Sequence, residues 1–257
     1  MSDIIALNLW QFSLIYILLL VVLFVMKRCQ IKQSKLLVVA SMRMTVQLIL
    51  AGLVLTAIFE NPHPAFTVLY LLAMTAFACF MTLQRNPGIN KKFKLIVALS
   101  LSASGLTILC FFILAVVGVN IFNPQYTIPI SGMIMGNALT GVSLGVKTFH
   151  ESVTSQRVLI DTLVNMGTAP PKILAPFANR ALETALLPTL NNMLGMGIIS
   201  LPGMMTGQIL SGTLPMTAIL YQISIIIAIC TVVCLAAFFS LFLGYRTLYN
   251  KRGQMLI

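Results

Sequence analysis

The chain has 257 residues, of which 59% are hydrophobic and only 8% are charged, and its mean hydropathy is +1.00. A soluble domain of this length closes its core with fewer apolar residues, so the composition excludes an ordinary soluble protein. The formal net charge of +11 is compatible with nucleic-acid binding. However, the charges lie in short loops between apolar runs, as is typical of membrane proteins, so we expect no nucleic-acid partner.

Several apolar runs reach the roughly 20 residues that cross a hydrocarbon layer of about 30 Å. We predict an all-α, polytopic membrane protein that lies in the lipid bilayer, with about seven transmembrane helices in one domain over residues 1–257. The predicted spans are 4–26, 36–59, 65–83, 95–119, 128–149, 188–205 and 216–243.

Lysine and arginine residues fall on one side of this arrangement, in the loops after the first, third and fifth spans and after the last. Cytoplasmic loops carry this excess of positive charge. We therefore expect a multi-pass protein of the cell (inner) membrane, with its N-terminus outside and its C-terminus in the cytoplasm.

The longest polar stretch is the loop 148–187, which holds three of the five acidic residues, Glu151, Asp161 and Glu183. Ser152 is placed to cap a short amphipathic helix, and Gly167 to end it in a left-handed turn. A second short helix is predicted over 172–187. Such a loop either lies on the membrane surface or inserts into a cleft on a soluble motor subunit.

Catalytic chemistry is poorly supported. The two histidines, His63 and His150, lie in loops on opposite sides of the membrane, and no HExxH, CxxC or GxSxG pattern is present. The stretch 141–148, GVSLGVKT, fails as a phosphate-binding loop because its lysine does not follow the glycine directly. We expect no enzyme activity and no cofactor bound by this chain, so any energy for transport comes from a partner.

Polar residues inside the spans are candidates for a functional path, because polar groups at membrane depth need partners. Arg43 is expected about 10 Å deep in the second span, with Gln47 one turn further on. Both a snorkelling arginine and a bundle-facing one fit this position. The amides downstream fit either helix–helix contacts or a substrate site. A small-residue face for close packing is predicted in the fifth span at Gly132, Gly136, Gly141 and Gly145.

Three stretches are distinctive together: RMTVQL at 43–48, IPISGMIMGN at 128–137 and SLPGMMTG at 200–207. In this order and spacing they resemble the FetB-like permease family, the membrane subunits of an iron-export ABC transporter. The resemblance covers nearly the whole chain. It implies a homodimeric permease with ATP bound on a separate cytoplasmic ABC ATPase subunit. Bacterial members are linked to iron export, and plant relatives to aluminium tolerance and to sugar-nucleotide export.

The loop after the fifth span also resembles the coupling loops of bacterial ABC permeases. We expect contact with the ATPase through Ile160, Leu163, Val164, Gly167, Ala169 and Pro170. The expected substrate path comprises Arg43, Gln47, Asn137, Glu183, Asn191, Asn192, Pro202, Gly203, Met204, Met205 and Gln208. Metal ligands are not assigned, because Fe(II) favours imidazole and carboxylate groups and the predicted spans hold almost none. An exported organic anion, or an ATP-independent channel or scaffold role, remains an alternative.

Overall fold

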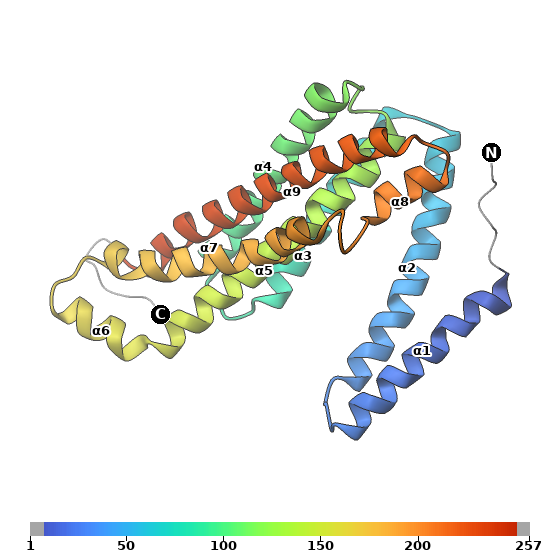
Figure 1. Ribbon diagram of the computed structural model, residues 1–257. Helices are drawn as coiled ribbons and strands as arrows, with labels where there is room; N and C mark the ends of the chain where they lie inside the picture. Colours follow the sequence, from blue (N-terminus) through green and yellow to red (C-terminus); the bar gives the residue numbers. More distant parts are fainter. Residues whose placement is uncertain (1–7, 251–257) are drawn as a thin grey trace. The chain divides into compact units, whose positions relative to one another are not determined.

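The computed structural model describes residues 8–250, which fold into helices joined by short turns (Figure 1). The α-helices are α1 (Leu9–Arg28), α2 (Ser34–Glu60), α3 (Pro64–Arg85), α4 (Lys91–Phe111), α5 (Pro124–Ser155), α6 (Arg157–Asn165), α7 (Pro170–Gly195), α8 (Gly203–Leu210) and α9 (Pro215–Gly244). A π-helical turn, Phe112–Val117, extends α4, and a 3-10 turn, Tyr245–Leu248, follows α9. The all-α fold class is confirmed.

The chain forms two compact units. The first contains α1, α2 and residues 210–213, and the second contains α3 to α7, α8 up to Ile209, and α9. In the first unit, α1 and α2 form a hairpin in which the hydroxyls of Tyr16 and Thr45 lie 2.6 Å apart. Large apolar side chains are exposed along both helices, including Phe24, which is 71% exposed. Such surfaces suit a lipid environment, in which apolar side chains need no burial in protein.

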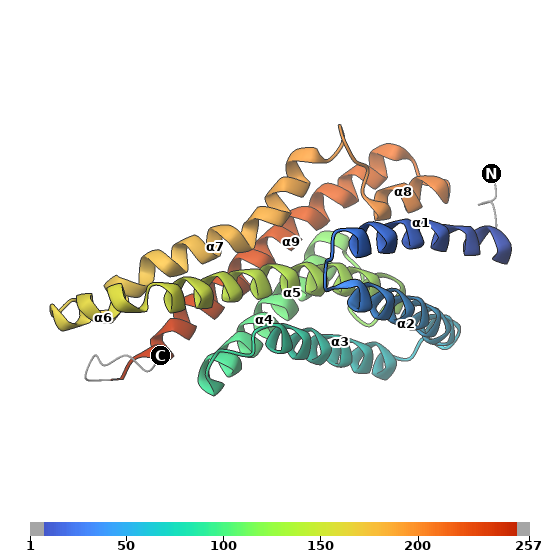
Figure 2. The same ribbon diagram turned by 90° about the horizontal axis from the view of Figure 1, so that it is seen from below.

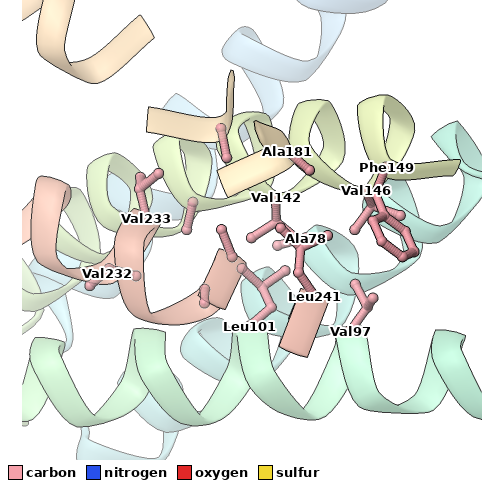
Figure 3. Packing of buried hydrophobic residues seen from close by; sticks show 14 of the residues in the cluster. Ala78, Val97, Leu101, Val142, Val146, Phe149, Ala181, Val232, Val233 and Leu241 are labelled. Atoms are coloured by element: carbon pink, nitrogen blue, oxygen red, sulfur yellow. The ribbon is translucent and has the colours of Figure 1, made fainter. Parts of the chain in front are cut away.

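The second unit is built around α5, which packs against α3, α4, α7 and α9 (Figures 1 and 2). Its core contains Leu101 of α4, Val142 and Phe149 of α5, and Val233 of α9 (Figure 3). These side chains are almost fully buried.

Close approach of α5 to its neighbours depends on Gly141 and Gly145. A methyl group on Gly141 would lie 2.5 Å from Val233 Cγ1 and 3.0 Å from the Ala185 carbonyl oxygen. On Gly145 it would lie 3.0 Å from Ala185 Cβ. The predicted small-residue face is therefore used for packing at these two positions, whereas Gly136 has nothing within 4 Å.

Within residues 8–250, six helices are long and apolar enough to cross a membrane, and they correspond to six of the seven predicted spans. Residues 4–7 of the first predicted span lie outside the described residues. The prediction for 188–205 is wrong in detail. Instead of a short helix ending at 187 and a new span starting at 188, α7 runs unbroken from Pro170 to Gly195. Residues 196–202 then leave the helical conformation, and α8 follows.

Packing explains why α7 continues past Pro188, and the local backbone conformation explains where it ends. The buried residues Ala178, Ala181, Ala185 and Thr189 follow a helical spacing that continues past Pro188, so packing on one face holds the helix together. The helix ends where Gly197 takes a left-handed conformation, with φ of 84°. The broken segment formed by α7, residues 196–202 and α8 thus takes the place of the sixth predicted span.

The predicted cap at Ser152 is also wrong, because α5 continues through it to Ser155. No proline or glycine lies between Phe149 and Ser155, so nothing in the local sequence stops the helix. The amphipathic helix begins later, at Arg157, and is the nine-residue α6.

Candidate functional site

The junction of α5, α6 and α7 is a candidate contact site for a partner outside the membrane. With 32 residues α5 is about 48 Å long, and with 26 residues α7 is about 39 Å long. Both exceed a hydrocarbon layer of about 30 Å. Since α6 joins their neighbouring ends, it lies at a tip of the second unit (Figure 2).

Charged side chains surround this tip. Lys147 pairs with Glu151 on α5, and Arg157 pairs with Asp161 on α6, each at 3.8 Å. All four side chains are more than half exposed, so these pairs contribute little to stability. They indicate instead that this end of the second unit faces water.

The two faces of α6 differ in what they contact. Ile160 is fully buried, and Leu163 and Val164 are half-buried against the same core. The helix is therefore amphipathic, as predicted, but its apolar stripe of Ile160, Leu163 and Val164 packs onto the protein itself. The expected contact of Ile160 with a partner is wrong, because its side chain is fully buried. The exposed apolar side chains are Val158 and Met166, at 82% and 76%, together with Leu159.

These three residues, which we call the α6 tip (Val158, Leu159 and Met166), were missed by sequence reasoning. The sequence signal that could have found them is the presence of apolar residues on both faces of a short polar helix. A helix that buries one apolar face in its own protein has no internal use for a second.

The turn after α6 is tightly defined. The amide of Gly167 donates to the Val164 carbonyl at 2.9 Å, and that of Thr168 donates to the Leu163 carbonyl at 3.0 Å. With Gly167 at φ of 84°, this is a Schellman motif. The predicted left-handed turn at Gly167 is confirmed, and Ala169 and Pro170 then begin α7.

The residues of the predicted substrate path are not gathered at one point. Arg43 and Gln47 are exposed on α2 of the first unit. Asn137 is half-buried on α5 and donates to the Met133 carbonyl of its own helix at 2.8 Å. Glu183 is exposed near the middle of α7.

The remaining path residues lie around the break between α7 and α8. Asn191 and Asn192 are exposed at the end of α7, Gly203 is exposed, and Met204 and Gln208 are half-buried. Pro202 and Met205 line a cavity beside α9. Gln222 of α9 also lines this cavity, but the predicted substrate path does not include it. The sequence signal that could have identified it is a polar amide within the apolar run 218–229.

No group of three His, Cys, Asp or Glu side chains in residues 8–250 is placed to hold a metal ion together. His63 accepts a hydrogen bond from the Ala65 amide at 3.2 Å at the start of α3. The described part of the chain therefore offers helix packing, an exposed tip and an apolar cavity as its functional features.

The fold and this site define a multi-pass, all-α membrane protein with a projecting helical tip. The model of the uncharacterised protein family UPF0014 matches residues 9–249, and the chain belongs to this family.

Individual relatives cover most of the chain. It is 30% identical to the UPF0014 membrane protein YjkA of Bacillus subtilis, over 95% of this chain and 96% of that one. It is 32% identical to the "Probable iron export permease protein FetB" of Escherichia coli, over 84% and 82% of the two chains. It is 31% identical to the protein ALUMINUM SENSITIVE 3 of Arabidopsis thaliana, over 83% and 77%. No solved structure matches the chain.

Proposed function

We propose that this protein is the permease subunit of an ABC exporter, that its cargo is iron and that a separate cytoplasmic ATPase binds and hydrolyses ATP. Two copies of the chain form the membrane part, in the cell (inner) membrane with the N-terminus outside and the C-terminus inside. The name of the Escherichia coli relative supports the cargo and the direction of transport.

The observation that carries the proposal is the α6 tip. Its two most exposed members, Val158 and Met166, project from a short helix that the Gly167 turn holds rigidly. Exposed apolar side chains within a charged rim are typical of the centre of a protein–protein interface. A short helix of this kind fits the cleft of a soluble motor subunit.

The alternative, a helix lying on the lipid surface, fits less well. Such a helix places its apolar stripe in the lipid. The stripe of α6 is already covered, because Ile160 is fully buried in the protein. The exposed residues form a small second face, which is better suited to contact with protein than to insertion into lipid.

The cargo path is proposed to bind its ion weakly. Carboxylate and imidazole ligands that would hold Fe(II) are not clustered in residues 8–250. An exporter needs no tight site, since a conformational change driven by ATP can release a weakly held ion. Glu183 at the α7 surface is proposed to attract cations, and the amides of Asn137, Asn191 and Asn192 to line the path.

The test is reconstitution of the full chain with its ABC ATPase in proteoliposomes. We expect ATP-dependent movement of Fe(II) and stimulation of ATP hydrolysis by the permease. Val158→Asp should abolish both, whereas Thr154→Asp, an exposed change on the neighbouring end of α5, should abolish neither. Iron movement without ATP, or equal activity of both variants, would contradict the proposal.

A further inference from the structure

A groove of about 340 Å³ runs between α4 and α9 of the second unit. The buried Ser100 and Ser104 of α4 form its floor, and its lining also includes Leu99 and Ala103 of α4 and Leu243 of α9. The last three residues are exposed, so the groove opens to the outside of this unit. In a bilayer, an apolar opening of this kind faces the hydrocarbon of the lipid.

The length of the groove fits one leaflet of a membrane. Its lining on α4 extends from Leu99 to Ile108, a rise of nine residues or about 14 Å along the helix. A hydrocarbon layer of about 30 Å contains two leaflets of about 15 Å each. The groove is therefore long enough to hold most of one lipid acyl chain.

Two cations, Lys92 and Arg246, lie at one end of this groove. A methyl group on Gly244 would lie 2.6 Å from Phe93 Cζ, so these two residues lie side by side where α4 begins and α9 ends. Lys92 directly precedes Phe93, and Arg246 follows Gly244 by two residues. Both cations are therefore at the end of the groove that Leu243 lines.

Each cation also lies on the groove side of its own helix. Lys92 is two helical turns before Leu99 on α4, and Arg246 is one turn after Leu243, within the 3-10 turn. The neighbouring cation Lys91 is rotated by about 100° around α4, away from the groove. Position on the helix thus distinguishes two adjacent lysines that have the same charge.

Neither groove cation is neutralised by the described protein. Lys92 and Arg246 are exposed and form no ion pair with a carboxylate of residues 8–250. The chain has no acidic residue from 61 to 150 or after 183, so none is close in sequence to either cation. An apolar groove that ends at two unpaired positive charges is complementary to a lipid with a negatively charged headgroup. A zwitterionic headgroup is less complementary, because it brings a further positive charge to the same place.

We propose that the groove between α4 and α9 is a binding site for one anionic phospholipid, whose acyl chain lies along the groove and whose phosphate binds Lys92 and Arg246. The lipid belongs to the leaflet that adjoins the α3–α4 turn. Because it contacts both helices, it stabilises their packing when it is bound. Binding here requires neither an ATPase nor a cargo, so its outcome is independent of the proposed function.

Native mass spectrometry of the full chain in detergent measures this binding. Dioleoyl phosphatidylglycerol is the anionic probe, and dioleoyl phosphatidylcholine has the same acyl chains with a zwitterionic headgroup. We expect phosphatidylglycerol to bind about tenfold more tightly than phosphatidylcholine. Lys92→Gln and Arg246→Gln should each weaken phosphatidylglycerol binding about fivefold. Lys91→Gln removes an equal charge at the same end of α4 and should bind like the wild type.

A second pair of variants tests the groove without changing the charge. Ala103→Phe places a large side chain in the groove and should weaken the binding of both lipids, whereas Ala115→Phe, at an exposed position outside the lining, should not. Equal affinity for the two lipids would overturn the proposal, as would an equal loss of binding in Lys91→Gln and Lys92→Gln. Normal lipid binding by Ala103→Phe would also overturn it, and a loss of dimers in the same spectra would then assign the groove to a second copy of the chain.

Discussion

Gly141 and Gly136 provide a matched pair within α5. Alanine at either position gains about 1 kcal/mol in helix propensity. At Gly141 the added methyl would lie 2.5 Å from Val233 Cγ1, and Val233 is fully buried and cannot swing aside. We expect Gly141→Ala to lower the thermal unfolding temperature in detergent, by an overpacking cost of about 1–3 kcal/mol.

The control is Gly136→Ala, which meets nothing within 4 Å and should unfold at the wild-type temperature or slightly above it. Equal unfolding temperatures for the two variants would mean that α5, α7 and α9 pack less closely than described.

Gly167 lies in the turn between α6 and α7, so its conformation sets the angle at which the two helices meet. A β-branched residue resists a φ of 84°, whereas asparagine tolerates it. We expect Gly167→Val to reduce co-purification with the ATPase and coupled transport severalfold, with normal membrane insertion. Gly167→Asn should retain both. If the valine variant stimulates its ATPase normally, the turn has no part in coupling.

We expect a substitution at Glu183 to distinguish two kinds of cargo by the sign of its effect on transport. The carboxylate is exposed on α7 and attracts cations electrostatically. Glu183→Gln should therefore raise the apparent KM for a metal cargo severalfold, with a smaller effect on the maximal rate. For an organic anion, such as a sugar nucleotide, the same change removes a repulsive charge and should leave the KM unchanged or lower it. Transport titrations with both cargoes measure this difference, and no change with either would leave Glu183 without a role in the path.

At the scale of elements, we expect the two faces of α6 to have separable roles, one in contact with the ATPase and one in stability. Met166→Asp changes an exposed side chain of the α6 tip and should weaken ATPase binding about tenfold or more, with an unchanged unfolding temperature. Ile160→Ala removes a buried side chain and should instead cost about 2–4 kcal/mol of stability. Pull-down and thermal unfolding of both variants distinguish these outcomes, and loss of ATPase binding only in Ile160→Ala would place the contact elsewhere.

Sequence patterns predicted the helices well where the length of an apolar run is enough to identify a membrane span. Six apolar runs are long helices, and their charged ends agree with the predicted loops. The pattern failed in α7, where Pro188 suggested a boundary that the helix does not have. Its burial of Ala181 and Ala185 against α5 outweighs this local preference, and such packing depends on residues about 40 positions earlier in the chain.

The candidate site was predicted less completely for the same reason. The sequence identified α6 as amphipathic, but only the tertiary structure decides which of its apolar residues the protein covers. Val158 and Ile160 are both apolar and two positions apart, yet one is 82% exposed and the other fully buried. The cavity at Gln222 likewise requires three separate segments, which no local pattern relates.

For the whole molecule, contacts within the second unit show which chain segments share a membrane side. The α3–α4 turn meets the end of α9, since the Asn90 side-chain amide donates to the Thr247 carbonyl at 3.2 Å. At the other end, the Thr67 hydroxyl of α3 donates to the Phe122 carbonyl before α5, at 3.2 Å. These pairs are compatible with the positive-inside assignment, in which the first pair is cytoplasmic and the second is external.

Single-cysteine labelling in a background without the five native cysteines tests this assignment. The exposed positions Lys91 and Ala169 should react with a membrane-impermeant maleimide only after the cells are opened, and exposed Gln125 should react in intact cells. Lys91 is preferable to Asn90, which is half-buried and holds Thr247. Since Ala169 adjoins the Gly167 turn, its labelling in intact cells would place the α6 tip outside, where no cytoplasmic ATPase could reach it. Reaction of Lys91 alone in intact cells would place the α3–α4 turn and α6 on opposite sides, which requires an odd number of crossings between them.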